Sequence, residues 1–264
     1  MKTKFVIILI LIYFLCWNCK SDEYVDPNYP TIYNALSEQA YNQVYGQLQQ
    51  TPFSTYTMLD TFGFPILVAD YDSLNAKDWR YKTSPEQLLK LTKEAIVEFG
   101  YFFHVTDSSL VSIRNIATTK NKKYDLFMKT FPDSLPTVWK VTTNQQIYNG
   151  IDVRGTSLSL VFSPYGLEAV GGHWFNEIYF PDSLIYNENA AKKLIMDETL
   201  SYNNTTITPD ETTSWQTSKK IVFPIRKSHQ IELRICWAIY PETWEVIIDT
   251  QTGEIFSAIN ISVL

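Results

Sequence analysis

Residues 145–174, QQIYNGIDVRGTSLSLVFSPYGLEAVGGHW, decide the expected fold because they read as short strands joined by tight turns. Leu158, Leu160 and Phe162 alternate with two serines and a valine. This period of two is typical of a strand that lays one face on a core. The stretch therefore predicts the strands of an antiparallel sheet.

Three glycines mark the turns of this stretch. Gly150 breaks one apolar run and Gly155 breaks the next. Gly166 closes a β-turn over residues 163–166, SPYG, in which proline pre-sets φ at the second position and glycine can take a positive φ. We expect the chain to turn at each of these glycines.

The order of these residues resembles the propeptides of thermolysin-like and fungalysin-like metalloproteases. Those propeptides carry a Gln-x-x-x-x-Gly-x-x-Val-x-Gly strand pair, followed by a strand, a glycine turn and a return strand. In that family the attached propeptide chaperones and inhibits its own protease. No protease follows in this sequence, so we expect any such action to occur in trans. The matching positions are Gln145, Gly150, Val153, Gly155 and Gly166.

The end of the chain resembles a PepSY domain. The string WEVIIDTQTGEI at residues 244–255 follows a Trp/Tyr-x-Val-x-Ile-Asp-x-x-x-Gly-Glu-Ile pattern that recurs there, where a helix packs on a curved antiparallel sheet. Asp249 opens a hairpin turn, and Gly253 is expected at its left-handed position. A catalytic role for Asp249 is the alternative to local hydrogen bonds with backbone N–H groups, which we favour. Together the two resemblances cover roughly residues 81–264 and specify fold better than partner.

The best-signalled helix begins at Ser84. Ser84 is the expected N-cap, Pro85 the first helical residue and Gln87 the third residue of a capping box. Gly100 is expected to end the helix at the C′ position. A further helix is expected at 35–48, and another at 190–198 after helix-start signals at Pro181 and Asn187. Further strands are expected at 110–117 and 231–240.

These elements predict an α+β fold: two units of curved antiparallel sheet packed against helices, with an N-terminal extension. The expected domains are a lipoprotein signal peptide at 1–18, a tether and N-terminal segment at 19–80, a propeptide-like unit at 81–180 and a PepSY-like unit at 181–264.

The first residues predict an address outside the cytoplasm. Lys2 and Lys4 precede an apolar run at residues 5–15, as in a signal peptide. Cys19 follows and resembles the acylated cysteine of a bacterial lipobox; a plain secretory signal is the alternative. We therefore expect a surface-exposed outer-membrane lipoprotein held by its N-terminal lipid. The residues after Cys19 resemble the surface-export signal of Bacteroidetes lipoproteins: Lys20, Ser21, Asp22 and Glu23.

Composition and charge exclude several classes of protein. With 45% hydrophobic and 15% aromatic residues, the 264-residue chain is not disordered. A net charge of −6 argues against a nucleic-acid partner, and the basic run at 120–123 reads as a solvated loop. Cys236 lies in an apolar strand and is expected to be a buried small hydrophobe, not a nucleophile.

No familiar catalytic pattern occurs in the sequence. It has no His-Glu-x-x-His zinc motif, no Gly-x-Ser-x-Gly elbow and no glycine-rich phosphate loop. His104, His173 and His229 are far apart, and each is expected to be a surface or strand residue. We therefore expect no metal site, no cofactor and no enzymatic activity. Three Asp-Ser-Leu triplets resemble Bacteroidetes O-glycosylation sites, at residues 72–74, 133–135 and 182–184.

Two classes of function fit these observations. In the first, the chain is a non-catalytic, lipid-anchored cell-envelope protein that binds a protein partner and regulates or chaperones a secreted protease in trans. In the second, it is a structural or glycan-binding accessory lipoprotein of an envelope assembly. The tyrosine-rich segment up to residue 80 is expected to cover a core edge, with sugar or peptide binding as its alternative.

Overall fold

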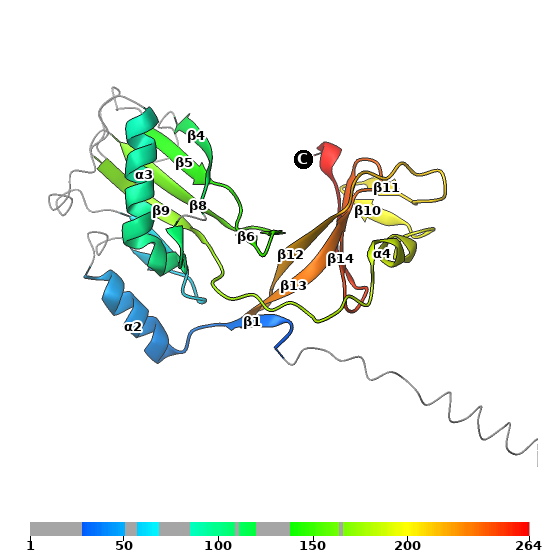
Figure 1. Cartoon of the computed structure of the whole chain (residues 1–264), viewed down its shortest axis with the longest axis horizontal. Helices are drawn as coiled ribbons and strands as arrows, with labels where there is room; N and C mark the ends of the chain where they lie inside the picture. The colour runs from blue at the N-terminus through cyan, green and yellow to red at the C-terminus, as the bar shows by residue number, and fades with distance from the viewer. Residues whose placement is uncertain are drawn as a thin grey trace, which may run out of the picture.

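The computed structural model describes residues 28–50, 57–68, 85–108, 111–119, 138–163 and 166–263. Two large sheets lie next to each other, each with helix against it (Figure 1). Their strand orders are β2-β3-β9-β8-β5-β4 and β15-β14-β13-β12-β7-β6, with β1 also paired to β13. The α+β class expected from the sequence is therefore confirmed in its broad form.

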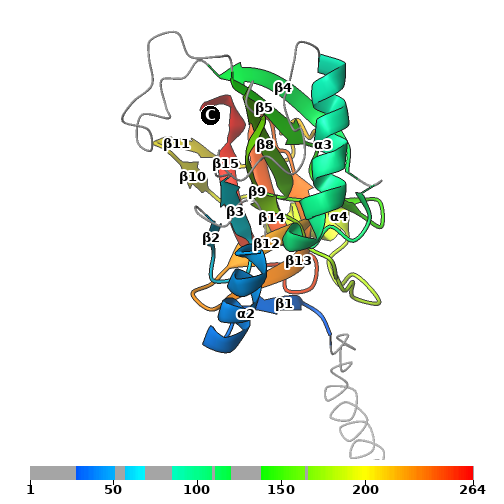
Figure 2. The ribbon, with the colours of Figure 1, turned by 90° about the vertical axis from the view of Figure 1, so that its left-hand side faces the viewer.

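The first sheet has six antiparallel strands and is covered on one face by the helix α3. Figure 2 shows α3 beside these strands. Leu158, Leu160 and Phe162 are fully buried on the covered face, as their alternation predicts. The strands are β2 Met58–Leu59, β3 Pro65–Val68, β4 Ile113–Thr119, β5 Val138–Thr143, β8 Ser157–Ser163 and β9 Gly166–His173.

Helix α3 spans Pro85–Phe99 and confirms the expected helix, although Ser84 lies outside the described residues. The α-helix ends at Phe99, directly before Gly100 as expected, but Gly100 does not take the left-handed conformation of a C′ residue. The chain continues as a 3-10 helix, η2 Gly100–Phe103, and the left-handed residue is His104, with φ 63°. A Cβ on Gly100 would lie 3.2 Å from the Cβ of Val105, so this glycine permits a close approach instead of a cap.

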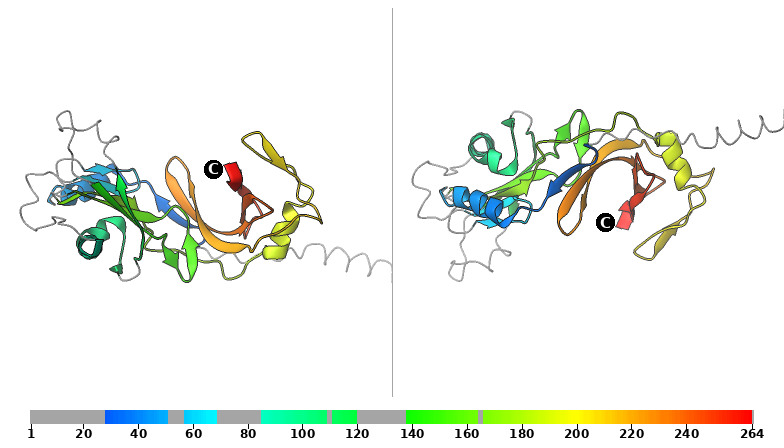
Figure 3. Two further views of the ribbon diagram at one scale, coloured as in Figure 1. Left: turned by 90° about the horizontal axis from the view of Figure 1, so that it is seen from above. Right: turned by 90° about the horizontal axis from the view of Figure 1, so that it is seen from below.

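The second sheet curves around the C-terminal end of the chain (Figure 3). Helix α4, Glu188–Leu194, packs against it through Ala191. The Asn187 side chain caps the helix by accepting the N–H of Ala190 at 2.9 Å. A short pair, β10 Leu200–Tyr202 and β11 Thr205–Ile207, forms its own sheet. The strands of the second sheet are β1 Thr31–Asn34, β6 Ile147–Tyr148, β7 Ile151–Val153, β12 Lys219–Arg226, β13 Gln230–Ile239, β14 Trp244–Asp249 and β15 Ile255–Asn260; η4 Ile261–Val263 follows.

Both sheets contain strands from the far side of the boundaries expected at residues 80 and 180. The N-terminal segment gives β1 to the second sheet and the hairpin β2–β3 to the first, with α2 Glu38–Leu48 between them. Strands β6 and β7 leave the first unit and join the second sheet. The β7–β12 pair is parallel, unlike the all-antiparallel sheets expected. The domain limits themselves stay a prediction.

The glycines expected at turns have positive φ angles. Asn149 and Gly150 form the tight β6–β7 turn, with φ of 49° and 77°. The other φ angles are 70° at Gly155, 136° at Gly166 and 72° at Gly253.

Several sequence features lie outside the described residues. They are Cys19 with the export residues that follow it, the basic run at 120–123, the triplets at 72–74 and 133–135, and the middle of the turn at 163–166. Within the described ranges, no helix is long and apolar enough to cross a membrane.

Candidate functional site: a cationic cleft between the two sheets

A small cleft of about 180 Å³ opens where the end of the first sheet meets the second. Its walls come from three places: the turn after β7, the end of β9 with the residues that follow, and the second half of β12. The lining residues are Arg154, Gly155, His173, Phe175, Phe223, Pro224 and Arg226.

The segment that resembles a propeptide builds one wall of this cleft. The N–H of Arg154 donates to the carbonyl of Val222 at 2.9 Å, which continues the parallel β7–β12 pairing to the cleft. The buried Gln146 side chain forms two hydrogen bonds with the backbone of Phe175. Its Oε1 accepts the Phe175 N–H at 3.0 Å, and its Nε2 donates to the Phe175 carbonyl. These bonds hold both sides of the cleft in place.

Arg154 is anchored at its tip. One guanidinium nitrogen, Nη2, donates to the Tyr240 hydroxyl at 3.1 Å and also pairs with the Glu245 carboxylate. Tyr240 in turn donates to Glu245 at 2.9 Å, and burial together with this carboxylate raises the pKa of Tyr240 to about 12. The tyrosine therefore stays neutral, and Arg154 has a fixed position at the cleft.

Arg226 is held much more loosely. Its Nη1 lies 3.8 Å from Asp60 Oδ2, beyond hydrogen-bond length, and its side chain is 49% exposed. The guanidinium carbon lies 5.7 Å from the centre of the Phe62 ring, a cation–π distance. The hairpin β2–β3 supplies both Asp60 and Phe62, so the N-terminal segment positions this arginine.

Asp60 also approaches His173. Its Oδ2 lies 3.7 Å from His173 Nε2, while its Oδ1 accepts the N–H groups of Phe62 and Phe64, each at 2.9 Å. Burial alone would raise the pKa of Asp60, but its interaction with His173 and the two backbone hydrogen bonds outweigh that effect and lower it. The carboxylate is therefore ionised and shared between His173 and Arg226.

Phe64 brings together two histidines that are far apart in the sequence. Its buried ring contacts His104 and His173 at centroid distances of 5.3 and 4.8 Å. Burial lowers the pKa of His104, so this imidazole is neutral near pH 7. His229 lies apart, in the β12–β13 turn, where its carbonyl accepts the N–H of Ala35. In the part of the chain that the structure describes, no group of three or more His, Cys, Asp or Glu could hold a metal ion.

The chemistry of the lining favours binding. It includes two arginines, a histidine and two phenylalanines, but neither a carboxylate nor a hydroxyl or thiol nucleophile. The acids Asp60 and Glu245 approach the arginines without lining the cleft. A small anionic group with an apolar attachment fits such a lining, because the arginines supply N–H donors and the aromatic rings supply apolar contact.

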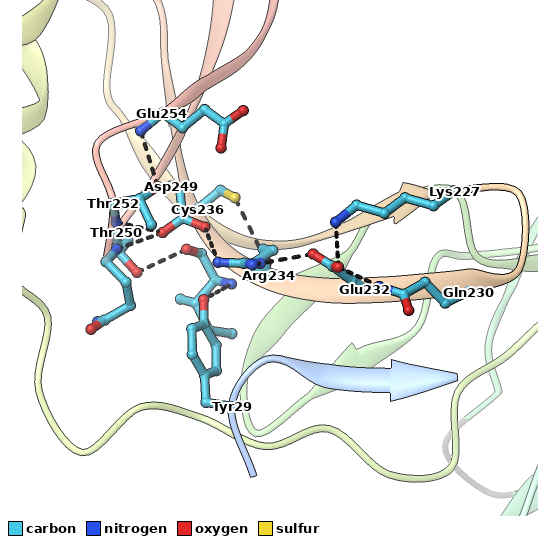
Figure 4. Close-up of polar contacts among 12 residues, drawn as sticks. Tyr29, Lys227, Gln230, Glu232, Arg234, Cys236, Asp249, Thr250, Thr252 and Glu254 are labelled. Carbon is cyan, nitrogen blue, oxygen red and sulfur yellow. Dashed lines mark hydrogen bonds and ion pairs between the residues drawn. The ribbon is translucent and has the colours of Figure 1, made fainter. Parts of the chain in front are cut away.

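A second polar cluster joins β13 to the end of β14 and is structural (Figure 4). Asp249 is fully buried, and its Oδ1 accepts the N–H groups of Gln251 and Thr252 at 2.6 and 3.0 Å, the local role favoured above. Its Oδ2 lies 3.3 Å from Arg234 Nη1, and Arg234 Nη2 lies 3.1 Å from Glu232 Oε2. Figure 4 shows Arg234 between the two carboxylates.

Cys236 is buried next to this cluster, as expected for a small hydrophobe. Burial and the nearby Asp249 carboxylate raise the pKa of its thiol. The thiol is therefore protonated, and it is a poor nucleophile.

The residues that matter most at the cleft were not found by reading the sequence. Arg154 had a faint signal, because it stands between Val153 and Gly155 in the propeptide-like pattern. Arg226 and Asp60 had none, since each belongs to a different sheet and only the fold brings them together.

The comparisons with known proteins give likeness of shape at low similarity. No family model matches the sequence, and no curated protein matches it. Among solved structures, a chain described as an uncharacterized protein from Eubacterium rectale ATCC 33656 shares 8% identity over 86% of this chain and 84% of that chain, with a TM-score of 0.42. The Bacillus megaterium YpeB C-terminal domain shares 11% identity over 86% of this chain and 98% of that domain, with a TM-score of 0.31.

Proposed function

We propose that this chain is a non-catalytic protein of the cell envelope that binds a protein partner through the cleft between its two sheets. The observation that carries the proposal is the lining: two arginines with aromatic neighbours and no nucleophile or carboxylate. Binding sites commonly combine apolar walls with a few fixed polar groups. The cleft has this composition, whereas hydrolysis would need a nucleophile or activated water and a base.

The rest of the proposal comes from the sequence. The second unit is PepSY-like through the pattern at residues 244–255, and the first is propeptide-like through the pattern that includes Val153 and Gly155. Cys19 carries the lipid, and the residues after it direct the protein to the outer face of the outer membrane. The partner on this view is a secreted protease, which the chain regulates or chaperones in trans.

Mixing the purified protein from residue 20 onward, called the body below, with secreted metalloproteases from the same source tests the function. We expect one of them to elute with the intact body in size-exclusion chromatography and to cleave a peptide substrate at a changed rate. A heat-inactivated sample of the same protease is the control for unspecific association. If the body is degraded or elutes alone with every protease, the protease-binding function is wrong and the accessory-lipoprotein alternative gains support.

A further inference from the structure

We propose that the cleft recognises the C-terminal carboxylate of a peptide whose last side chain is apolar. This inference rests on the proposed function, because it names the part of a protein partner that the same cleft would hold. It starts from the contrast between the two arginines of the lining, Arg154 and Arg226.

The guanidinium of Arg226 has N–H donors available for a ligand. Its nearest carboxylate oxygen is 3.8 Å away, and the described residues offer its guanidinium no shorter ion pair or hydrogen bond. An arginine presents five N–H donors in a planar fork that matches a carboxylate in two parallel bonds. Arg154, in contrast, comes from the turn after the neighbouring strand β7, and its guanidinium is held by Tyr240 and by the Glu245 carboxylate, which offsets its charge. A ligand carboxylate would therefore bind Arg226.

The side chains that line the cleft favour a single anionic group. The chain carries a net charge of −6, yet the lining holds two arginines and no acid. Asp60 is the nearest competitor for Arg226, and it is already engaged by two backbone N–H groups and by His173. Its remaining attraction for Arg226 is weak at this separation and exposure. A ligand carboxylate can thus add bonds to Arg226 without breaking one.

The walls and the size select what is attached to the carboxylate. Phe223 and Pro224, which are half-buried, supply apolar surface next to the arginines, whereas Phe175 is 2% exposed and lies behind that surface. A volume of about 180 Å³ is below the range of roughly 300–1,000 Å³ typical of drug-sized ligand sites. One terminal residue with its carboxylate is a suitable occupant, and the rest of the peptide would extend into solvent. A free phosphate would satisfy the arginine but leave the apolar walls without contact.

Peptide titration tests the inference. The chain from residue 20 onward is titrated by calorimetry with acetyl-Ala-Ala-Leu carrying a free C-terminus, with the same peptide as its amide, and with inorganic phosphate. We expect the free acid to bind and the amide to bind at least about tenfold more weakly, because a charge-assisted bond is lost. Equal binding of acid and amide, or binding of phosphate alone, would overturn the proposal.

A pair of variants places the binding in the cleft. Arg226→Gln should weaken the free acid by about tenfold or more, while Arg226→Lys should retain part of the binding as a point charge. Lys220→Gln, at an exposed position of the same strand β12, is the matched control and should bind like the wild type. Thermal melts check that every variant is folded. If Arg226→Gln is folded and binds the free acid like the wild type, the carboxylate site is not here.

The outcome is separable from that of the proposed function. If the wild-type body forms a complex with a protease but ignores every peptide, only the carboxylate inference fails. If the free acid binds through Arg226 and no protease associates, the cleft binds a different class of partner, and the protease part of the proposed function fails instead.

Discussion

The hydroxyl oxygen of Tyr29 accepts the backbone N–H of Ile235 at 2.9 Å, although 206 residues separate the two in the chain. One edge of β13 is shared, because β1 pairs with residues 230–233 and β14 with residues 236–239. Ile235 lies in the gap between these partners, and its carbonyl accepts both the backbone N–H and the hydroxyl of Thr250. Tyr29 and Thr250 thus complete the hydrogen bonding of β13 where neither strand reaches.

Tyr29→Phe should lower the free energy of unfolding by about 1–3 kcal/mol, because the buried N–H of Ile235 loses its acceptor. Urea melts followed by circular dichroism measure the effect. Tyr101→Phe is the control, since Tyr101 is 61% exposed and should change stability little. Equal melts for wild type and Tyr29→Phe would mean that this bond contributes nothing net.

Glu232 should make stability fall in acid. Burial alone would raise the pKa of Glu232, but Lys227 and Arg234 outweigh that effect and lower it below its ordinary 4.5. A depressed folded-state pKa gives stability that is present above the unfolded-state pKa and is lost as the pH falls through the folded-state value.

Comparing urea melts at about pH 7 and about pH 3 isolates this contribution. Glu232→Gln should be less stable than the wild type at the higher pH, and the difference should shrink at the lower pH. Glu211→Gln, at an exposed position, is the control. An unchanged difference between wild type and Glu232→Gln across this range would contradict the prediction.

Gly253→Val should destabilise the last hairpin by about 1–3 kcal/mol through backbone strain, because Gly253 has φ 72°. The new Cβ would also lie 2.9 Å from side-chain atoms of Leu194 and Tyr186. Gly46→Ala in helix α2 has open space around its Cβ and should instead stabilise the protein by about 0.5–1 kcal/mol. Urea melts that show a lower free energy of unfolding for Gly253→Val and a higher one for Gly46→Ala would support both predictions.

Trp244→Ala should cost about 3–5 kcal/mol, since the side chain is a buried member of the core against α4. Tyr101→Ala removes a large aromatic side chain from an exposed position and serves as the comparison. Chemical denaturation with an unchanged midpoint for Trp244→Ala would show that the core does not depend on this residue.

Cys19→Ala should move the protein from the membrane fraction to the soluble fraction, because the lipidated cysteine would be lost. Cys16→Ala should leave it membrane-bound. Fractionation of cells expressing each variant decides between the two cysteines. Retention of Cys19→Ala in the membrane would contradict lipidation at this position.

Local patterns predicted some of the elements of this fold, whereas strands such as β1 and β12 were not expected. Leu158, Leu160 and Phe162 are all on the covered face because every second residue of a strand points to the same side of the sheet. The capping side chain of Asn187 is found at the start of α4 because its partner is three residues away. Both signals are contained within a few consecutive residues, so they can be predicted from the sequence.

Contacts between distant segments were beyond local patterns. Nothing near Tyr29 indicates that its hydroxyl completes the edge of β13, and nothing near Asp60 indicates an arginine of β12. The sequence likewise gives no sign that His104 and His173 meet at Phe64, because a hairpin from a different part of the chain joins them. The cleft is built almost entirely from such contacts, which is why the sequence alone did not reveal it.

The position of β1 has a mechanical consequence. Strand β1 pairs with β13 near the start of the described chain. The chain then continues through α2 to the hairpin that carries Asp60 beside Arg226. Tension applied at the N-terminus is therefore borne first by the β1–β13 ladder, and next by the hairpin at the cleft. If the N-terminus is the membrane anchor, a force between the membrane and a bound partner would act on the same segments that form the cleft.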